Sequence, residues 1–243
     1  MAPGRKPRRR KTGRARRYYL AACLLVIIVG GVVWYAFLLP HQSQGTKGAV
    51  KPIILYVNQG NGVVNVTNFG AMSDFAVAHG FNTVFFQIYR DGILLFNQQA
   101  LQTFVGQAHQ MNLSIFFALS FTNSSQQIPS SIYGLGEDGV SLDMLTLGFS
   151  TQQSLLASLK AGYNGTTAVT TSNLTSTLKP DLLVLETYSP GTQSYIRPGI
   201  IGSVEVVATS SQADYRSQFQ YALQNSDGVM VFDYAGLMRS EYY

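Results

Sequence analysis

Residues 138–143 read Asp-Gly-Val-Ser-Leu-Asp, a short apolar run that begins at a glycine and ends on a carboxylate. Two later runs share this pattern: Leu-Leu-Val-Leu at 182–185 leads into Glu186, and Val-Met-Val-Phe at 229–232 leads into Asp233. Apolar runs without polar alternation are typical of parallel strands buried on both faces. A (β/α)-barrel presents its polar groups at the C-terminal ends of such strands. The three acids therefore predict a common rim.

Short Val-, Ile- and Phe-rich runs alternate with helical patterns from residue 51 onward, which indicates βα units around a parallel sheet. The fold class predicted is α/β, a compact (β/α)8 TIM barrel of fewer residues than the roughly 250 that are typical. We expect the fifth βα unit to be the most reduced. The predicted strands are 53–57, 83–88, 114–119, 139–143, 167–171, 182–187, 203–208 and 228–234, and the predicted helices are 68–79, 98–110, 151–161, 173–178 (short) and 212–224.

The N-terminal region carries a charge step. Residues 1–17 hold nine Lys or Arg and no acid, whereas the rest of the chain holds eight basic and twelve acidic residues. Residues 18–39 carry no charge, and a run of this length matches the roughly 20 apolar residues that cross a bilayer. Because a basic flank stays inside, we expect a basic cytoplasmic tail (1–17), a transmembrane helix (18–39), a linker (40–50) and an extracytoplasmic barrel (51–243). This makes the membrane a predicted partner.

Two processing alternatives compete with an uncleaved signal anchor. Residues 20–23, Leu-Ala-Ala-Cys, match a bacterial lipobox in letters, and Arg16-Arg17 begin a stretch that faintly resembles a twin-arginine export signal. Cys23 is the only cysteine, so the outer domain has neither a disulfide nor a thiol nucleophile. We read the basic tail as a positive-inside flank and expect no nucleic-acid partner.

Asn-x-Ser/Thr sequons favour an external location, although a Ser- and Thr-rich composition without attached glycan is the alternative. The five predicted glycosylation sites are Asn65, Asn112, Asn123, Asn164 and Asn173.

Three stretches resemble glycosyl-hydrolase-like barrels. Residues 81–92, Phe-Asn-Thr-Val-Phe-Phe-Gln-Ile-Tyr-Arg-Asp-Gly, resemble the second-strand signature of that family. Residues 138–143 look like the strand-four motif that the family shares with chitinase-like hydrolases, and residues 228–234 look like its last strand. The resemblance implies a (β/α)8 barrel and a carbohydrate ligand. It also shows a departure, because Leu145 stands where chitinase-like enzymes carry the Glu that acts as general acid.

Candidate catalytic residues follow from the carboxyl pair that glycoside hydrolysis usually needs. Asp143, Glu186 and Asp233 each end a predicted strand. Glu205 lies inside the predicted seventh strand, where a position far from the rim is as plausible as one near it. The alternative for these acids is that they cap helices or pair with Arg90 or Arg197.

Polar and aromatic residues at strand ends suit sugars, which need hydrogen bonds and a stacking face, although packing at the rim is the alternative for each of them. Neither H-x-H nor H-E-x-x-H occurs, so we expect no metal, and we expect no cofactor because neither G-x-G-x-x-G nor a P-loop occurs. His79 and His109 precede strands and belong to the bottom of a barrel. The predicted substrate-binding residues are Asn58, Gln87, Tyr89, Arg90 and Tyr188.

The function that these features favour is a membrane-anchored extracytoplasmic barrel, related to glycoside hydrolases, that cleaves or binds a cell-surface or environmental glycan. The alternative is a non-catalytic barrel that serves as an envelope or membrane-complex interaction module. Three acids on one rim favour the first hypothesis, and the leucine at position 145 favours the second.

Overall fold

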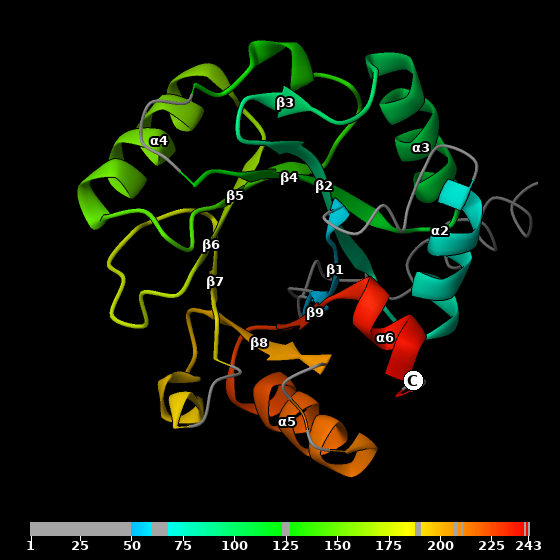
Figure 1. Ribbon diagram of the computed structural model, residues 1–243, viewed down its shortest axis with the longest axis vertical. Helices are drawn as coiled ribbons and strands as arrows, with labels where there is room; N and C mark the ends of the chain where they lie inside the picture. The colour runs from blue at the N-terminus through cyan, green and yellow to red at the C-terminus, as the bar shows by residue number, and fades with distance from the viewer. Residues whose placement is uncertain are drawn as a thin grey trace, which may run out of the picture. The chain divides into compact units, whose positions relative to one another are not determined.

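Eight parallel strands form a closed ring in the computed structural model, and helices pack on its outside (Figure 1). Each strand pairs with the next one along the barrel, and β1 pairs with both β2 and β9, which closes it. The parallel strands are β1 (Ile53–Val57), β2 (Thr83–Arg90), β4 (Ser114–Ser120), β5 (Gly139–Asp143), β6 (Thr166–Thr171), β7 (Leu182–Leu185), β8 (Ile201–Glu205) and β9 (Val229–Phe232). The structure describes residues 50–59, 68–122, 127–187, 191–206, 209, 211–240 and 242.

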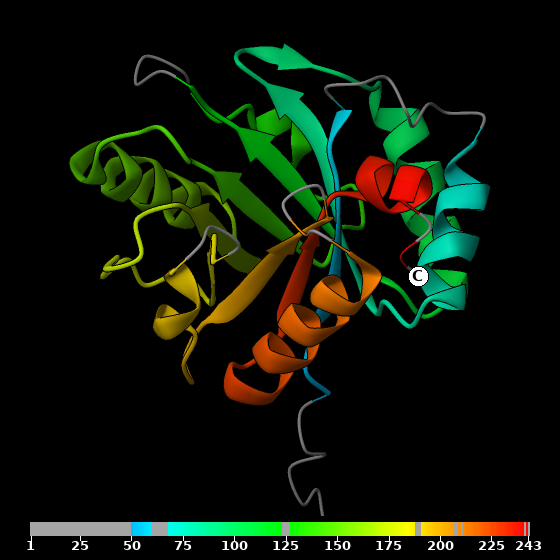
Figure 2. The same ribbon diagram turned by 60° about the horizontal axis from the view of Figure 1, so that its bottom comes forward.

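The helices cover the ring unevenly. Figures 1 and 2 show loops and a 3-10 turn, rather than α-helices, outside β6 and β7. The helices are α2 (Phe69–Ala78), α3 (Gln98–Gln110), α4 (Phe149–Gly162), α5 (Gln212–Asn225) and α6 (Tyr234–Ser240), with 3-10 turns η3 (Ser130–Ile132) and η4 (Thr192–Tyr195). The expected eight-stranded barrel with a reduced fifth βα unit is confirmed.

The short helix predicted at 173–178 is wrong. Oδ1 of Asn173 accepts hydrogen bonds from the backbone N–H and the hydroxyl of Thr175, at 3.2 and 3.0 Å. An Asn side chain that bonds the backbone two residues on stabilises a turn in place of a helix. Residues 172–181 therefore connect β6 to β7 without a helix.

A two-residue antiparallel strand, β3 (Ile93–Leu94), extends β2 and was not predicted. Asp91 and Gly92 form the turn, and both have positive φ, 49° and 93°. Oδ1 of Asp91 also accepts hydrogen bonds from the backbone N–H and hydroxyl of Thr122, at 2.9 and 2.8 Å. Asp and Gly suit this turn because both tolerate positive φ better than most residues.

Alternating side chains divide the core in two. Residues that point out of the ring pack against the helices in a large cluster that includes Leu142. Those that point inward form a smaller cluster. Because the side-chain period of a strand is two, Gly139, Ser141 and Asp143 of β5 face the interior while Leu142 faces the helices. The interior cluster comprises Ile54, Tyr56, Phe85, Phe116, Ala118, Ala168, Val184, Ile201 and Met230.

The opening motif places its two acids at opposite ends of the barrel. Asp138 precedes β5 at the base, where Oδ2 accepts the backbone N–H of Ile115 at 2.7 Å and lies 2.8 Å from Nε2 of His109. Asp143 ends the same strand at the mouth. Asp138, at the base of the barrel, therefore has a structural role, whereas Asp143, at the mouth, is placed where a site can form.

Within the described residues, no helix is long and apolar enough to cross a membrane. The predicted tail and transmembrane helix, residues 1–39, lie outside those residues, as does the linker up to residue 49.

Candidate functional site at the barrel mouth

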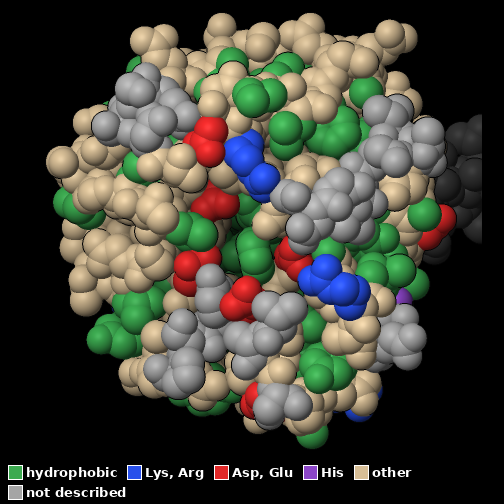
Figure 3. All heavy atoms as spheres, in the orientation of Figure 1, with side chains coloured by type: hydrophobic (Ala, Val, Ile, Leu, Met, Phe, Trp, Pro, Cys, Tyr) green, Lys and Arg blue, Asp and Glu red, His purple; other side chains and the backbone are tan. Residues whose placement is uncertain are grey.

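Acidic side chains gather around a hollow at the mouth of the barrel, as Figure 3 shows. Four of them stand at or directly after the C-terminal ends of strands. Asp143 and Glu205 are the last residues of β5 and β8, and Glu186 and Asp233 follow β7 and β9 directly. The rim predicted from the opening motif is therefore present in the fold.

Glu205 is closer to the rim than the sequence indicates. The seventh barrel strand was predicted at 203–208, and the structure shows it at Ile201–Glu205. Its register pairs Glu205 with Phe232 on β9. The predicted bounds were wrong because Ile200 and Ile201 extend the apolar run toward the base of the barrel. The sequence alone does not determine at which residue the hydrogen-bonded pairing with the neighbouring strands ends.

Asp143 is buried at the mouth and held by two hydroxyls. Its Oδ2 accepts hydrogen bonds from Tyr56 (2.8 Å) and from Ser120 (2.9 Å), and the residue is only 8% exposed. The N-cap of the following helix is Gly148, so Asp143 does not cap α4. Its contacts are those of a carboxylate set into the barrel interior.

Gln87 and Arg90 extend the hydrogen-bond network of Asp143 beyond Ser120. The Gln87 amide donates to the Ser120 hydroxyl, and its Oε1 accepts from Arg90 (2.7 Å) and from the backbone N–H of Gln59 (2.9 Å). Arg90 also donates to Oδ1 of Asn58 at 2.8 Å. Three predicted ligand residues, Asn58, Gln87 and Arg90, thus belong to one network with Asp143.

Burial governs the ionisation of this network. It raises the pKa of Asp143, against the hydrogen bonds from Tyr56 and Ser120 and the charge of Arg90, which lower it. Burial and then the Asp143 charge raise the pKa of Tyr56 well above its ordinary value. Tyr56 therefore keeps its proton and serves as the donor in this pair.

Two buried hydroxyls beside Asp143 have no hydrogen-bond partner among the described residues. They belong to Ser141 and Thr170. Thr170 is the register partner of Asp143 on β6, and Ser141 lies two residues before it on the same face. Because a buried polar group without a hydrogen bond is costly, these two hydroxyls leave unused hydrogen-bonding capacity in the barrel interior beside Asp143, which a buried water would satisfy.

Glu205 and Asp233 form a second acidic group on the opposite strands. Burial, and then the negative charge of Asp233, raise the pKa of Glu205. Asp233 has a structural task as well, because its Oδ1 accepts the backbone N–H of Gly236 at 2.8 Å in the first turn of α6. The helix-cap alternative stated for these acids therefore holds for Asp233.

The Tyr56 and Phe232 rings lie between the two acidic groups. Their centroids are 4.9 Å apart, Tyr56 bonds Asp143, and Phe232 is the register partner of Glu205. Tyr56 was missed because an aromatic residue within an apolar strand is read as core packing. Its position two residues before Asn58, on the same strand face, is the signal that could have identified it.

The remaining predicted residues lie elsewhere. Tyr89 packs in the outer core against Phe121, with centroids 5.4 Å apart, because a bulge between Gln87 and Tyr89 shifts the strand register. Tyr188, Asn65 and Asn123 lie outside the described residues. Of the other sequons, Asn112 and Asn164 are exposed and Asn173 is half-buried in its turn. Among the described residues, no three His, Cys, Asp or Glu side chains gather where they could hold a metal.

No family model and no curated protein matches this chain. Solved structures of similar fold include a chitinase from Bacteroides thetaiotaomicron, at 11% identity and TM-score 0.57, which covers 76% of this chain and 90% of the chitinase. A β-mannanase from Alicyclobacillus acidocaldarius matches at 9% identity and TM-score 0.51, over 75% and 86% of the two chains. A xylanase-α-amylase inhibitor protein in complex with trehalose matches at 11% identity and TM-score 0.54, over 80% of this chain and 97% of the inhibitor protein. At these identities the likeness shows the fold: a closed (β/α)8 barrel of the kind that glycoside hydrolases have.

Proposed function

We propose that this protein is a membrane-anchored, extracytoplasmic barrel that binds a glycan in its mouth. The observation that carries the proposal is the Asp143 centre, a buried carboxylate fixed by Tyr56 and Ser120. The hydroxyls of Ser141 and Thr170 beside it have no hydrogen-bond partner among the described residues. A sugar hydroxyl is a hydrogen-bond donor, so it can donate to the Asp143 carboxylate at the end of β5.

Two further features support a carbohydrate ligand. Phe232 is half-buried at the mouth and offers an apolar face beside the polar groups. The proteins of similar fold include a chitinase, a β-mannanase and an inhibitor protein bound to trehalose. Specific polar contacts together with an apolar face are typical of small-molecule sites.

A glycan array probed with the full-length protein, followed by calorimetric titration of the strongest hit, tests the proposal. We expect saturable binding of at least one oligosaccharide. If the folded protein retains no glycan from a broad array, the proposal is wrong, and the non-catalytic interaction module becomes the better hypothesis.

Glycoside hydrolysis is the second candidate, and Glu205 is the observation that favours it. A carboxyl group whose pKa is raised by burial and by a neighbouring acid suits the role of general acid, because it holds the proton that the leaving oxygen needs. We expect release of reducing sugar from a bound oligosaccharide, with Glu205→Gln abolishing release and retaining binding. Equal release by the variant and the wild type would remove Glu205 from the reaction. Binding without release by the wild type would assign the mouth to recognition alone.

The membrane topology is a separate proposal, supported by the basic run at 1–17 and the uncharged run at 18–39. We expect protease added to intact cells to digest the barrel and to spare the tail, because the positive flank stays in the cytoplasm. Tags on both termini, detected by immunoblot, report the two fragments. A barrel that resists protease until the cells are opened would reverse the orientation.

A further inference from the structure

A cavity of about 310 Å³ opens on the side of the barrel between α5 and α2, away from the mouth. In a full (β/α)8 barrel an eighth helix would follow the last strand and cover this side. Here β9 is followed by α6, which has seven residues. Among the described residues, α6 covers only part of the barrel wall on this side, and the cavity lies beside it.

The cavity has ordered walls. Tyr234 of α6 packs edge-on against Phe75 of α2, with centroids 5.2 Å apart, and Tyr242 contacts Tyr215 of α5 at 6.1 Å. Oδ1 of Asp233 fixes the first turn of α6. These contacts tie α6 and Tyr242 to the helices on both sides, so the space is part of the packed fold.

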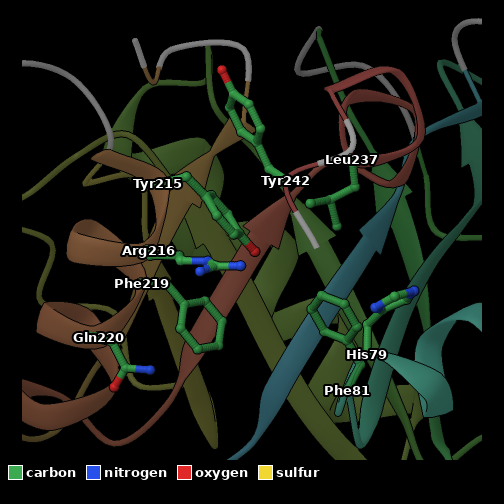
Figure 4. Close-up of a pocket in the computed structure, with 8 residues that line it drawn as sticks. All are labelled: His79, Phe81, Tyr215, Arg216, Phe219, Gln220, Leu237 and Tyr242. Atoms are coloured by element: carbon green, nitrogen blue, oxygen red, sulfur yellow. The ribbon is translucent and has the colours of Figure 1, made fainter. Parts of the chain in front are cut away.

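Figure 4 shows a cavity lined mainly by aromatic side chains, with the Arg216 guanidinium as the permanently charged group among them. Tyr215 and Arg216 extend from α5 toward the wall that Phe81 and His79 form, and Phe219 lies below them. None of the described residues that line the cavity is acidic. Arg216 makes no hydrogen bond or ion pair with the described residues, so its five N–H donors remain available.

Tyr215 adds a neutral donor to this wall. Its side chain is 7% exposed, and burial raises its pKa to about 12. The hydroxyl therefore stays protonated at physiological pH and adds no negative charge beside Arg216. A guanidinium and a phenol on one wall together match a carboxylate, which accepts two parallel hydrogen bonds from arginine.

We propose that this cavity is a binding site for an aromatic monocarboxylate. Arg216 and Tyr215 hold the carboxylate, and Phe219 and Phe81 enclose the ring. The volume is at the lower end of the roughly 300–1,000 Å³ of small-molecule sites, which favours a ligand of one or two rings. None of the lining residues belongs to the barrel mouth, so the proposal stands independently of glycan binding.

Titration of the full-length protein with 2-naphthoate tests the proposal, with neutral 2-naphthamide as the matched probe. We expect saturable binding of 2-naphthoate and about tenfold weaker binding of the amide, since a charge-assisted bidentate pair is lost. Arg216→Gln should weaken naphthoate binding by about the same factor and leave amide binding unchanged. Arg216 is exposed, so the variant should fold.

Arg197→Gln is the matched control, because Arg197 is also exposed but bonds the carbonyl of Tyr195 and does not line the cavity. It should bind 2-naphthoate as the wild type does, and Tyr215→Phe should show a smaller loss than Arg216→Gln. Failure of the wild type to bind, equal affinity for acid and amide, or equal losses in Arg216→Gln and Arg197→Gln would each overturn the assignment.

Discussion

Replacement of Asp143 by asparagine is expected to weaken glycan binding by about 10- to 100-fold, because a hydrogen bond to a charged group contributes roughly 1.5–3 kcal/mol. Asparagine has nearly the same size, and its amide oxygen can still accept from Tyr56 and Ser120, the two donors on Oδ2. The negative charge is lost, and the other carboxylate oxygen becomes an NH2 group that cannot accept. Calorimetric titration of both proteins with the glycan found on the array measures the effect.

Asp138→Asn is the control for this experiment, because it makes the same chemical change at the other end of the same strand. Asp138 bonds Ile115 and His109 at the base of the barrel, so its loss should lower stability and leave glycan affinity unchanged. If Asp143→Asn binds the glycan as well as Asp138→Asn does, Asp143 is not part of the site.

The same variant should change how stability depends on pH. Burial raises the pKa of Asp143 above its unfolded value of about 3.9, so the folded protein binds the proton more tightly than the unfolded chain. The wild type should therefore gain stability relative to Asp143→Asn as pH falls toward about 4 and lose it as pH rises through the folded pKa. Melting temperatures of both proteins between about pH 4 and 7 measure this difference. The opposite trend would mean that Arg90, Tyr56 and Ser120 outweigh burial.

Gly139→Ala should destabilise the barrel by about 2 kcal/mol. A Cβ built on Gly139 would clash with the ring of Phe116, and that ring is buried and stacked on Phe85 at a centroid distance of 4.9 Å. Overpacking in a core costs roughly 1–3 kcal/mol, which exceeds the roughly 0.4–1 kcal/mol gained when alanine restricts the unfolded chain. Urea denaturation of the two proteins gives the difference.

Gly106→Ala is the matched substitution with the opposite expected sign. Gly106 is exposed within α3, and nothing lies within 4 Å of the Cβ that alanine would add. Alanine is favoured over glycine inside a helix by about 1 kcal/mol, so this variant should be more stable than the wild type. Destabilisation of similar size in both variants would show that the close contact with Phe116 does not govern the result.

The chain itself determines the order and type of its main elements, because side-chain periodicity is a local property. Short continuous apolar runs and the helical stripes between them predicted all eight barrel strands and four of the helices, including β1, β5 and α3 at their observed bounds. The same local pattern predicted that Asp143 stands at the C-terminal end of a strand. The helix predicted at 173–178 was wrong because a local side-chain hydrogen bond at Asn173 stabilises a turn in its place.

Only the tertiary structure decided which groups meet at the mouth. Tyr56 and Asp143 are 87 residues apart in sequence. Closure of the barrel through the β1–β2 and β1–β9 ladders brings the Tyr56 hydroxyl oxygen within 2.8 Å of Oδ2 of Asp143. The ladder register likewise placed Glu205 at the rim, and a bulge turned Tyr89 away from it. The cavity beside α5 also arises from packing, since it depends on how much of the barrel wall a seven-residue helix can cover. Register, closure and helix coverage are relations between distant segments, and no window along the chain contains them.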